Sequence, residues 1–130
     1  MATEILVNDG GAPARILPFT AGTAISGGNV VVMSSSGTAD VAATEAGANV
    51  LGVALTDASD GANCSIITGR GVILNAYVSG TVASGGALQV GTTDGEFAAW
   101  DTTTAGAVVA IMLGEDTEGA SSQLAKVMLI

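Results

Sequence analysis

Two groups of carboxylates are the residues whose type and spacing are best suited to chemistry. Each group follows an apolar run, and the two groups match when the chain is shifted by 58 residues. The members are Asp57 and Asp60 in the first group and Glu115, Asp116 and Glu118 in the second. Oxygen-rich turns can hold calcium, but the twelve-residue calcium loop with its closing bidentate Glu is absent. A general acid/base pair would need burial to shift a pKa, and nothing in the sequence indicates burial there. We interpret both groups as solvated turns after buried strands, with calcium binding left open.

Other residues that carry chemistry are scarce. The chain has no histidine, which removes the commonest general base, the usual nucleophile pairs and the commonest metal ligand. Cys64 is the single cysteine, so it allows neither an intrachain disulfide nor a zinc cluster, and we expect it to be a small buried hydrophobe. The single lysine, Lys126, does not belong to a phosphate-binding loop. We predict no catalytic, cofactor-binding or metal-binding residue and expect that the chain is not an enzyme.

The charge of the chain is strongly one-sided. Three basic residues (Arg15, Arg70 and Lys126) stand against twelve acidic ones, for a net charge of −9. Nucleic acids and anionic membranes are both bound through Lys and Arg, so we expect neither as a partner. The residues after Met1 lack the basic and apolar regions of a signal peptide. The longest apolar stretch, Ala107–Leu113, is too short to span a membrane. We therefore expect a soluble protein made in a cytoplasm.

The elements that position these residues are predicted to be short strands. A chain of 130 residues is long enough to bury a core, and with 48% apolar but 3% aromatic residues that core must be aliphatic. Nineteen dispersed glycines disfavour helices, whereas β-branched runs bounded by Gly, Ser, Asn and Asp indicate strands. The expected strands are Ile5–Val7, Val30–Met33, Val50–Leu55, Cys64–Thr68, Val72–Val78, Ala87–Val90, Glu96–Trp100, Val108–Leu113 and Leu124–Ile130.

An internal repeat organises these strands. A shift of 58 residues aligns Thr20–Val72 with Val78–Ile130 without a gap, and places Gly22–Gly28 on Gly80–Gly86. The repeated Ser-Gly-Gly before an apolar run supplies the positive φ of a tight turn. The repeat predicts an all-β domain over residues 20–130, a small barrel or sandwich closed by two similar halves of about 58 residues. Residues 1–19 lie outside the repeat, and we predict that they form an extended N-terminal arm.

Two segments resemble known phage proteins. Residues 87–111, with Ala99-Trp100-Asp101, a Thr-rich stretch and a Gly-Ala-Val strand, resemble the head decoration protein of lambda-like tailed phages. Leu51–Ala62, a Gly-Val-Ala-Leu strand before an acidic Gly-containing turn, resembles a second group of phage capsid decoration proteins. The first repeat and the arm depart from the lambda pattern.

The resemblance implies a β-rich, β-tulip-like fold and a structural function. It implies a homotrimer seated on three-fold or quasi-three-fold axes of the capsid, with the major capsid protein as its partner. It also implies a protein of the outer capsid surface of the virion, synthesised in the host cytoplasm. Such a cement protein would stabilise the mature phage head against the pressure of packaged DNA. An N-terminal arm would become ordered when it reaches the shell.

The arm supplies the candidate contacts with the capsid. An extended apolar segment suits addition to an exposed sheet edge, and the candidates are Ile5, Leu6 and Val7, with Ile16, Leu17 and Phe19 as secondary contacts. The alternative for these residues is an ordinary edge strand of the same domain.

The alternative function is a receptor- or carbohydrate-binding β-module of a phage fibre or cell surface. The single tryptophan, Trp100, could mark a binding hot spot or be a half-buried strand residue.

Overall fold

The computed structural model describes residues 5–8, 15–42, 50–101, 108–117 and 122–130. Within these ranges every regular element is a strand, and no helix is long and apolar enough to cross a membrane. The strands are β1 (Leu6–Asn8), β2 (Arg15–Thr20), β3 (Val30–Met33), β4 (Ala39–Val41), β5 (Val50–Ala54), β6 (Asn63–Thr68), β7 (Ile73–Val78), β8 (Ala87–Val90), β9 (Phe97–Ala99), β10 (Ala110–Met112) and β11 (Gln123–Leu129).

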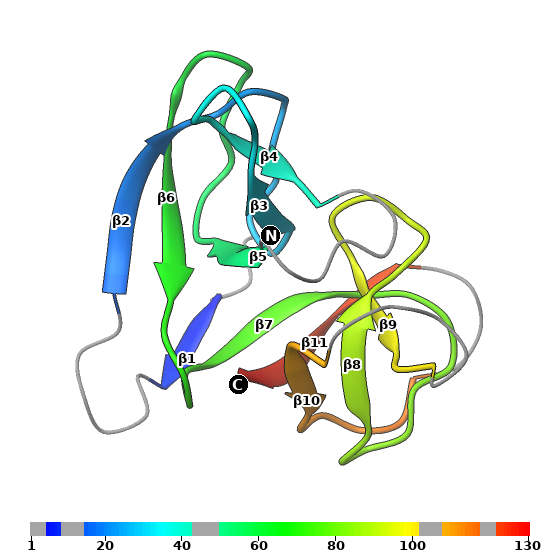
Figure 1. Cartoon of the computed structure of the whole chain (residues 1–130). Helices are drawn as coiled ribbons and strands as arrows, with labels where there is room; N and C mark the ends of the chain where they lie inside the picture. The colour runs from blue at the N-terminus through cyan, green and yellow to red at the C-terminus, as the bar shows by residue number, and fades with distance from the viewer. Residues whose placement is uncertain (1–4, 9–14, 43–49, 102–107, 118–121) are drawn as a thin grey trace.

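The strands form two sheets with the same internal order. One sheet runs β2-β6-β5-β3-β4, and the other runs β1-β7-β11-β10-β8-β9, so strands β7 to β11 repeat the order of β2 to β6 (Figure 1). We call β2–β6 the first half and β7–β11 the second half. A parallel bridge between Ala21 and Ala39 joins the two ends of the first sheet, and Val78 and Phe97 form the equivalent pairing in the second. Each half is therefore curled like a small barrel, and the expected all-β fold is confirmed.

Backbone hydrogen bonds match between the halves. Gly28 N donates to Ala54 O at 2.8 Å, and Gly85 N donates to Met112 O at 2.7 Å. Gly28 and Gly85 have φ values of 95° and 81°, so the turn before the strand does use the glycine freedom that the sequence predicted.

The gapless alignment is nevertheless wrong by one residue at this turn, because it placed Gly28 on Gly86. The physical reason lies in the next loop, since residues 34–38 join β3 to β4 and the longer stretch 91–96 joins β8 to β9. The two halves therefore match strand by strand but not at one constant spacing.

The first half encloses a small core of its own. Each member of this core matches one residue of the second half by its place in the strand order and pairing. The matching residues lie in the second half's core or pack against it. The first set is Ala21, Ile25, Val31, Ala39, Ala54, Cys64 and Ile66, and the matching set is Val78, Val82, Leu88, Phe97, Met112, Ala125 and Val127. The second half thus fills the same plan with some much larger side chains, such as Phe97 in place of Ala39.

A second, shared core joins the two halves. Val30, Val32, Val53 and Ile67 of the first half belong to the same buried cluster as the second half's core. Because side chains alternate along a strand, these residues face away from the first half's own core. The halves are also joined through backbone bonds, and Gly95 is central to them, since its N–H donates to Ala42 O and its carbonyl accepts from Val30 N, both at 2.8 Å.

Strands form at the nine predicted places, with shifts of a few residues at their ends, but β2 and β4 were not predicted. Residues 15–19, expected in an extended arm, instead belong to β2, which pairs with β6 from Arg15↔Thr68 to Thr20↔Asn63. The physical reason is that these residues take the place beside β6 that β7 takes beside β11 in the second sheet. Residues 1–4 and 9–14 of the predicted arm lie outside the described residues.

Gly52 in β5 offers a test of the packing. A Cβ at this position would overlap the Ile67 carbonyl oxygen, whereas the second half has Ala110 at the matching place. We predict that Gly52→Ala lowers the free energy of unfolding by about 1–3 kcal/mol, because overpacking forces the backbone to shift. Urea unfolding followed by circular dichroism measures it.

Gly114→Ala is the control, since its Cβ would meet Lys126 N at an ordinary 3.4 Å and should change stability by less than about 0.5 kcal/mol. Equal stability of the two variants would contradict the crowding at Gly52.

Candidate docking surface

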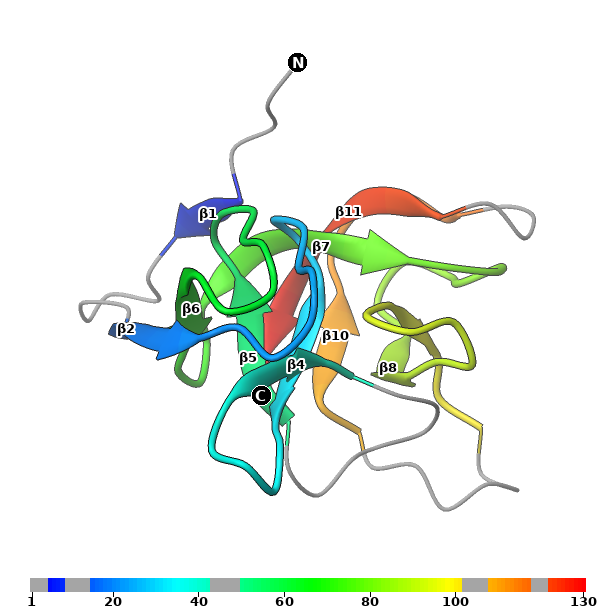
Figure 2. The ribbon, with the colours of Figure 1, turned by 90° about the horizontal axis from the view of Figure 1, so that it is seen from above.

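The first three candidate contact residues lie in strand β1 of the chain's own sheet or directly before it. Strand β1 lies beside β7 and pairs with it (Figure 2). Ile5 is buried in the core, and its carbonyl accepts from Asn75 N at 2.6 Å. Leu6 packs against the same core. Val7 lies in β1, but its side chain is outside the described residues. The structure thus has the ordinary edge strand that was the alternative, and a capsid contact by these three residues stays a prediction.

The secondary candidates lie on β2 and include accessible side chains. Ile16 and Leu17 are 44% and 40% exposed, whereas Phe19 is half-buried against the first half's own core. Strand β2 is at the edge of its sheet and pairs on one side with β6. The matching strand of the second half, β7, is covered on its other edge by β1. Ile16 and Leu17 are therefore exposed at this edge of the described structure, one on each face of the sheet, whereas the matching Ile73 and Leu74 of β7 are half-buried and buried.

Pro18 explains why this edge can stay open. Ser65, the partner of Pro18 across the β2–β6 ladder, directs its carbonyl to Leu55 N on the other side, at 2.9 Å. In an antiparallel ladder the Pro18 nitrogen must then point to the free edge. Asn75, which matches Pro18 in the second half, uses its N–H there to bind β1. Proline removes that donor from β2, which is a known way to protect an edge from further strand addition.

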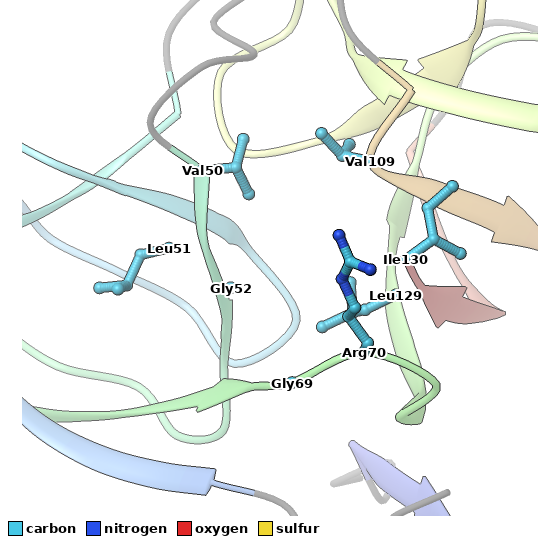
Figure 3. A pocket seen from close by; sticks show the side chains of 8 residues that line it. All are labelled: Val50, Leu51, Gly52, Gly69, Arg70, Val109, Leu129 and Ile130. Carbon is cyan, nitrogen blue, oxygen red and sulfur yellow. The ribbon is translucent and has the colours of Figure 1, made fainter.

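A pocket opens between the two halves near the start of β2. Its volume is about 300 Å³, and its lining consists of Val50, Leu51, Gly52, Gly69, Arg70, Val109, Leu129 and Ile130. Arg70 is exposed, and its side chain points into the gap between Val50 and the Val109–Ile130 side (Figure 3). Thr68, two residues before Arg70, pairs with Arg15. We call Arg15, Ile16, Leu17 and the pocket together the Arg70 end, and it contains two of the chain's three basic residues.

Two of the acidic side chains, one in each matched group, accept hydrogen bonds that hold turns. Asp57 Oδ1 accepts the Gly27 N–H at 2.7 Å, and Asp116 Oδ1 accepts the Ser84 N–H at the same distance. Both bonds fix the tight turn that precedes the second strand of each half along the chain, β3 or β8. Among the described residues no three acidic, cysteine or histidine side chains are grouped to hold a metal ion, and Glu118 lies outside them.

The remaining singled-out residues differ in accessibility. Cys64 is buried, as expected, and burial raises the pKa of its thiol, which disfavours the reactive thiolate. Trp100 follows β9 and is 43% exposed, so it is accessible to a partner. The sequence search did not single out Arg70, although its rarity as a basic residue was a usable signal.

Comparison with known proteins gives one informative likeness. No protein-family model matches the chain, and no curated protein matches its sequence. A solved structure with a similar fold is the crystal structure of the head fiber gp8.5 N base in bacteriophage phi29, with a TM-score of 0.68 and 15% sequence identity. The match covers 91% of this chain and 95% of that one. The chain therefore shares its fold with that fiber base over almost its whole length.

The turn carboxylates can be tested by truncation. We predict that Asp57→Ala lowers the free energy of unfolding by about 1 kcal/mol, because the Gly27 N–H loses a charged acceptor. Denaturant titration gives the value. Asp60→Ala removes an exposed carboxylate from the same turn and is the control, with an expected change below about 0.5 kcal/mol. If both variants unfold at the same denaturant concentration, the capping bond contributes nothing.

Pro18 can be tested by restoring the missing donor. We predict that Pro18→Thr raises the average mass in solution as concentration increases, because the edge of β2 regains an outward N–H next to exposed Ile16 and Leu17. Light scattering over a concentration series measures the mass. Adding Ile16→Lys should return the mass to that of the unmodified protein, since an edge lysine opposes strand addition. A Pro18→Thr protein with unchanged mass would show that proline does not protect this edge.

Proposed function

We propose that the chain is a structural protein of a tailed-phage head, a decoration protein that binds the outer surface of the mature shell. The observation that carries this proposal is the likeness of fold to a phage head-fiber base across 91% of the chain. The resemblance of residues 87–111 and 51–62 to phage capsid decoration proteins points in the same direction. The partner is the major capsid protein, and neither nucleic acid nor membrane is involved.

The proposed role is structural rather than enzymatic. The chain has no histidine, and its chemistry-bearing side chains are used to build the fold. Asp57 and Asp116 fix turns, and Cys64 packs in a core. These uses support a protein that acts through contact surfaces.

The proposed mechanism is cementing by a homotrimer. Three copies that dock together gain avidity, because each docked copy raises the effective concentration of the others. A protein that binds only the mature shell stabilises that shell by mass action, by about 2.7 kcal/mol per site at a hundred times Kd. Over many sites, this energy opposes the outward pressure of packaged DNA. The exposed Ile16 and Leu17 on β2 are the accessible candidates for the contact.

One observation favours a second candidate, a receptor- or carbohydrate-binding module. Trp100 is 43% exposed, and exposed aromatic rings are suited to stacking against sugars. A single exposed tryptophan supports this reading less strongly than the likeness of the whole fold supports a role on the head.

Co-sedimentation with expanded, undecorated heads of the phage that encodes the chain tests the proposal. The protein should pellet saturably with the heads, and light scattering should give the mass of a trimer. Absence of saturable binding would contradict the decoration role and lead to glycan and cell-surface partners instead.

Two variants separate the candidate functions. We predict that Ile16→Ser combined with Leu17→Ser weakens head binding at least tenfold, because both side chains are exposed and apolar, while Trp100→Ala leaves it unchanged. Sedimentation isotherms give the affinities, and circular dichroism checks that both variants are folded. The decoration account fails if Trp100→Ala abolishes head binding, or if the β2 variant binds like the unmodified protein.

A further inference from the structure

The pocket at the Arg70 end combines one charge with an apolar lining. Arg70 is the single charged residue that lines it, and the others are glycines and aliphatic residues. Among the described residues, the Arg70 side chain has no ion pair or hydrogen bond. A guanidinium beside aliphatic side chains is suited to a carboxylate, which it can bind through two parallel hydrogen bonds.

The distribution of charge restricts what this end attracts. The chain has a net charge of −9 with three basic residues, and two of them, Arg15 and Arg70, lie at this end. The third, Lys126, lies in β11 and does not line the pocket. An acidic partner is repelled by most of the surface and attracted here, so charge complementarity orients its approach.

The aliphatic lining indicates what kind of side chain lies next to the carboxylate in the partner. Ile130 is 49% exposed at the pocket, and Val50, Leu51 and Val109 are half-buried there. A volume of about 300 Å³ is at the small end of ligand pockets and suits one or two side chains rather than a large cofactor. A small, fully hydrated anion would leave this apolar area uncovered.

We propose that the Arg70 end binds a protein segment that carries a carboxylate next to a large apolar side chain. The carboxylate pairs with the Arg70 guanidinium, and the apolar side chain enters the pocket between Val50, Val109 and Ile130. This inference rests on the proposed function, in which the segment belongs to the major capsid protein. It also orients the chain, with the Arg70 end toward the shell and the acidic turns away from it.

Two pairs of variants test the inference by co-sedimentation with expanded, undecorated heads. Arg70→Glu and Lys126→Glu change the net charge equally, but only the first changes the pocket. Ile130→Ser and Leu113→Ser each remove an exposed aliphatic side chain, of 49% and 39% exposure, and Leu113 lies outside the pocket. We expect at least tenfold weaker binding for Arg70→Glu and Ile130→Ser, and binding within twofold of the unmodified protein for the two controls. Higher salt should weaken the binding of the unmodified protein more than that of Arg70→Gln.

The outcomes distinguish this inference from the function on which it rests. If the unmodified protein does not bind heads, the proposed function fails and the inference fails with it. If it binds, and Arg70→Glu binds like Lys126→Glu, the inference is overturned while the decoration role stands. A loss of trimer mass in Arg70→Glu, measured by light scattering, would identify a second copy of the chain as the occupant and would also overturn it. Thermal unfolding of each variant checks that the protein stays folded when exposed Arg70 or Ile130 is replaced.

Discussion

The shared core between the two halves is the interaction on which the rest of the structure depends. In β3, Val31 faces the first half's own core, while Val30 and Val32 face the core shared with the second half. A strand that is apolar on both faces must be covered on both, and each fully buried valine contributes about 1.5–3 kcal/mol relative to exposure. The first half cannot bury both faces of β3 alone. The duplication is therefore useful only if the halves pack together, and the backbone bonds through Gly95 help to fix them in one arrangement.

The two halves have the same strand order but different exposed edges. The second half holds larger core residues, such as Phe97 and Met112, and its edge strand β7 is covered by β1. The first half leaves β2 uncovered, with Pro18 at the position where β7 donates to β1. This difference concentrates exposed aliphatic residues, two arginines and a pocket at one end of the molecule. In a decoration protein such an end can face the shell, while the acidic surface elsewhere keeps the protein soluble.

The sequence predicted the strand-rich class, nine strand positions and the duplication, because glycine-bounded β-branched runs and a repeated Ser-Gly-Gly carry those signals directly. Strand β2 was not predicted because Pro18 interrupts it. Its mostly exposed residues also lack the alternation of apolar and polar side chains that identifies a strand. The dipeptide Ile16-Leu17 recurs as Ile73-Leu74, which would have revealed β2 if the alignment had allowed a gap. It missed β4 because Ala39–Val41 is short and contains a charge. The pocket and Arg70 could not be predicted, since residues from β5, the turn after β6 and the end of β11 meet there through the packing of the halves.

In the proposed arrangement, this fold is attached to the outside of a phage head by its Arg70 end. Cryo-electron microscopy of expanded heads saturated with the protein would show that attachment. The account predicts trimeric density on three-fold or quasi-three-fold axes of the outer surface, into which the structure fits with Arg70 and Ile16 next to the major capsid protein. Heads without added density, or density in which the turns at Asp57 and Asp116 face the shell, would contradict it.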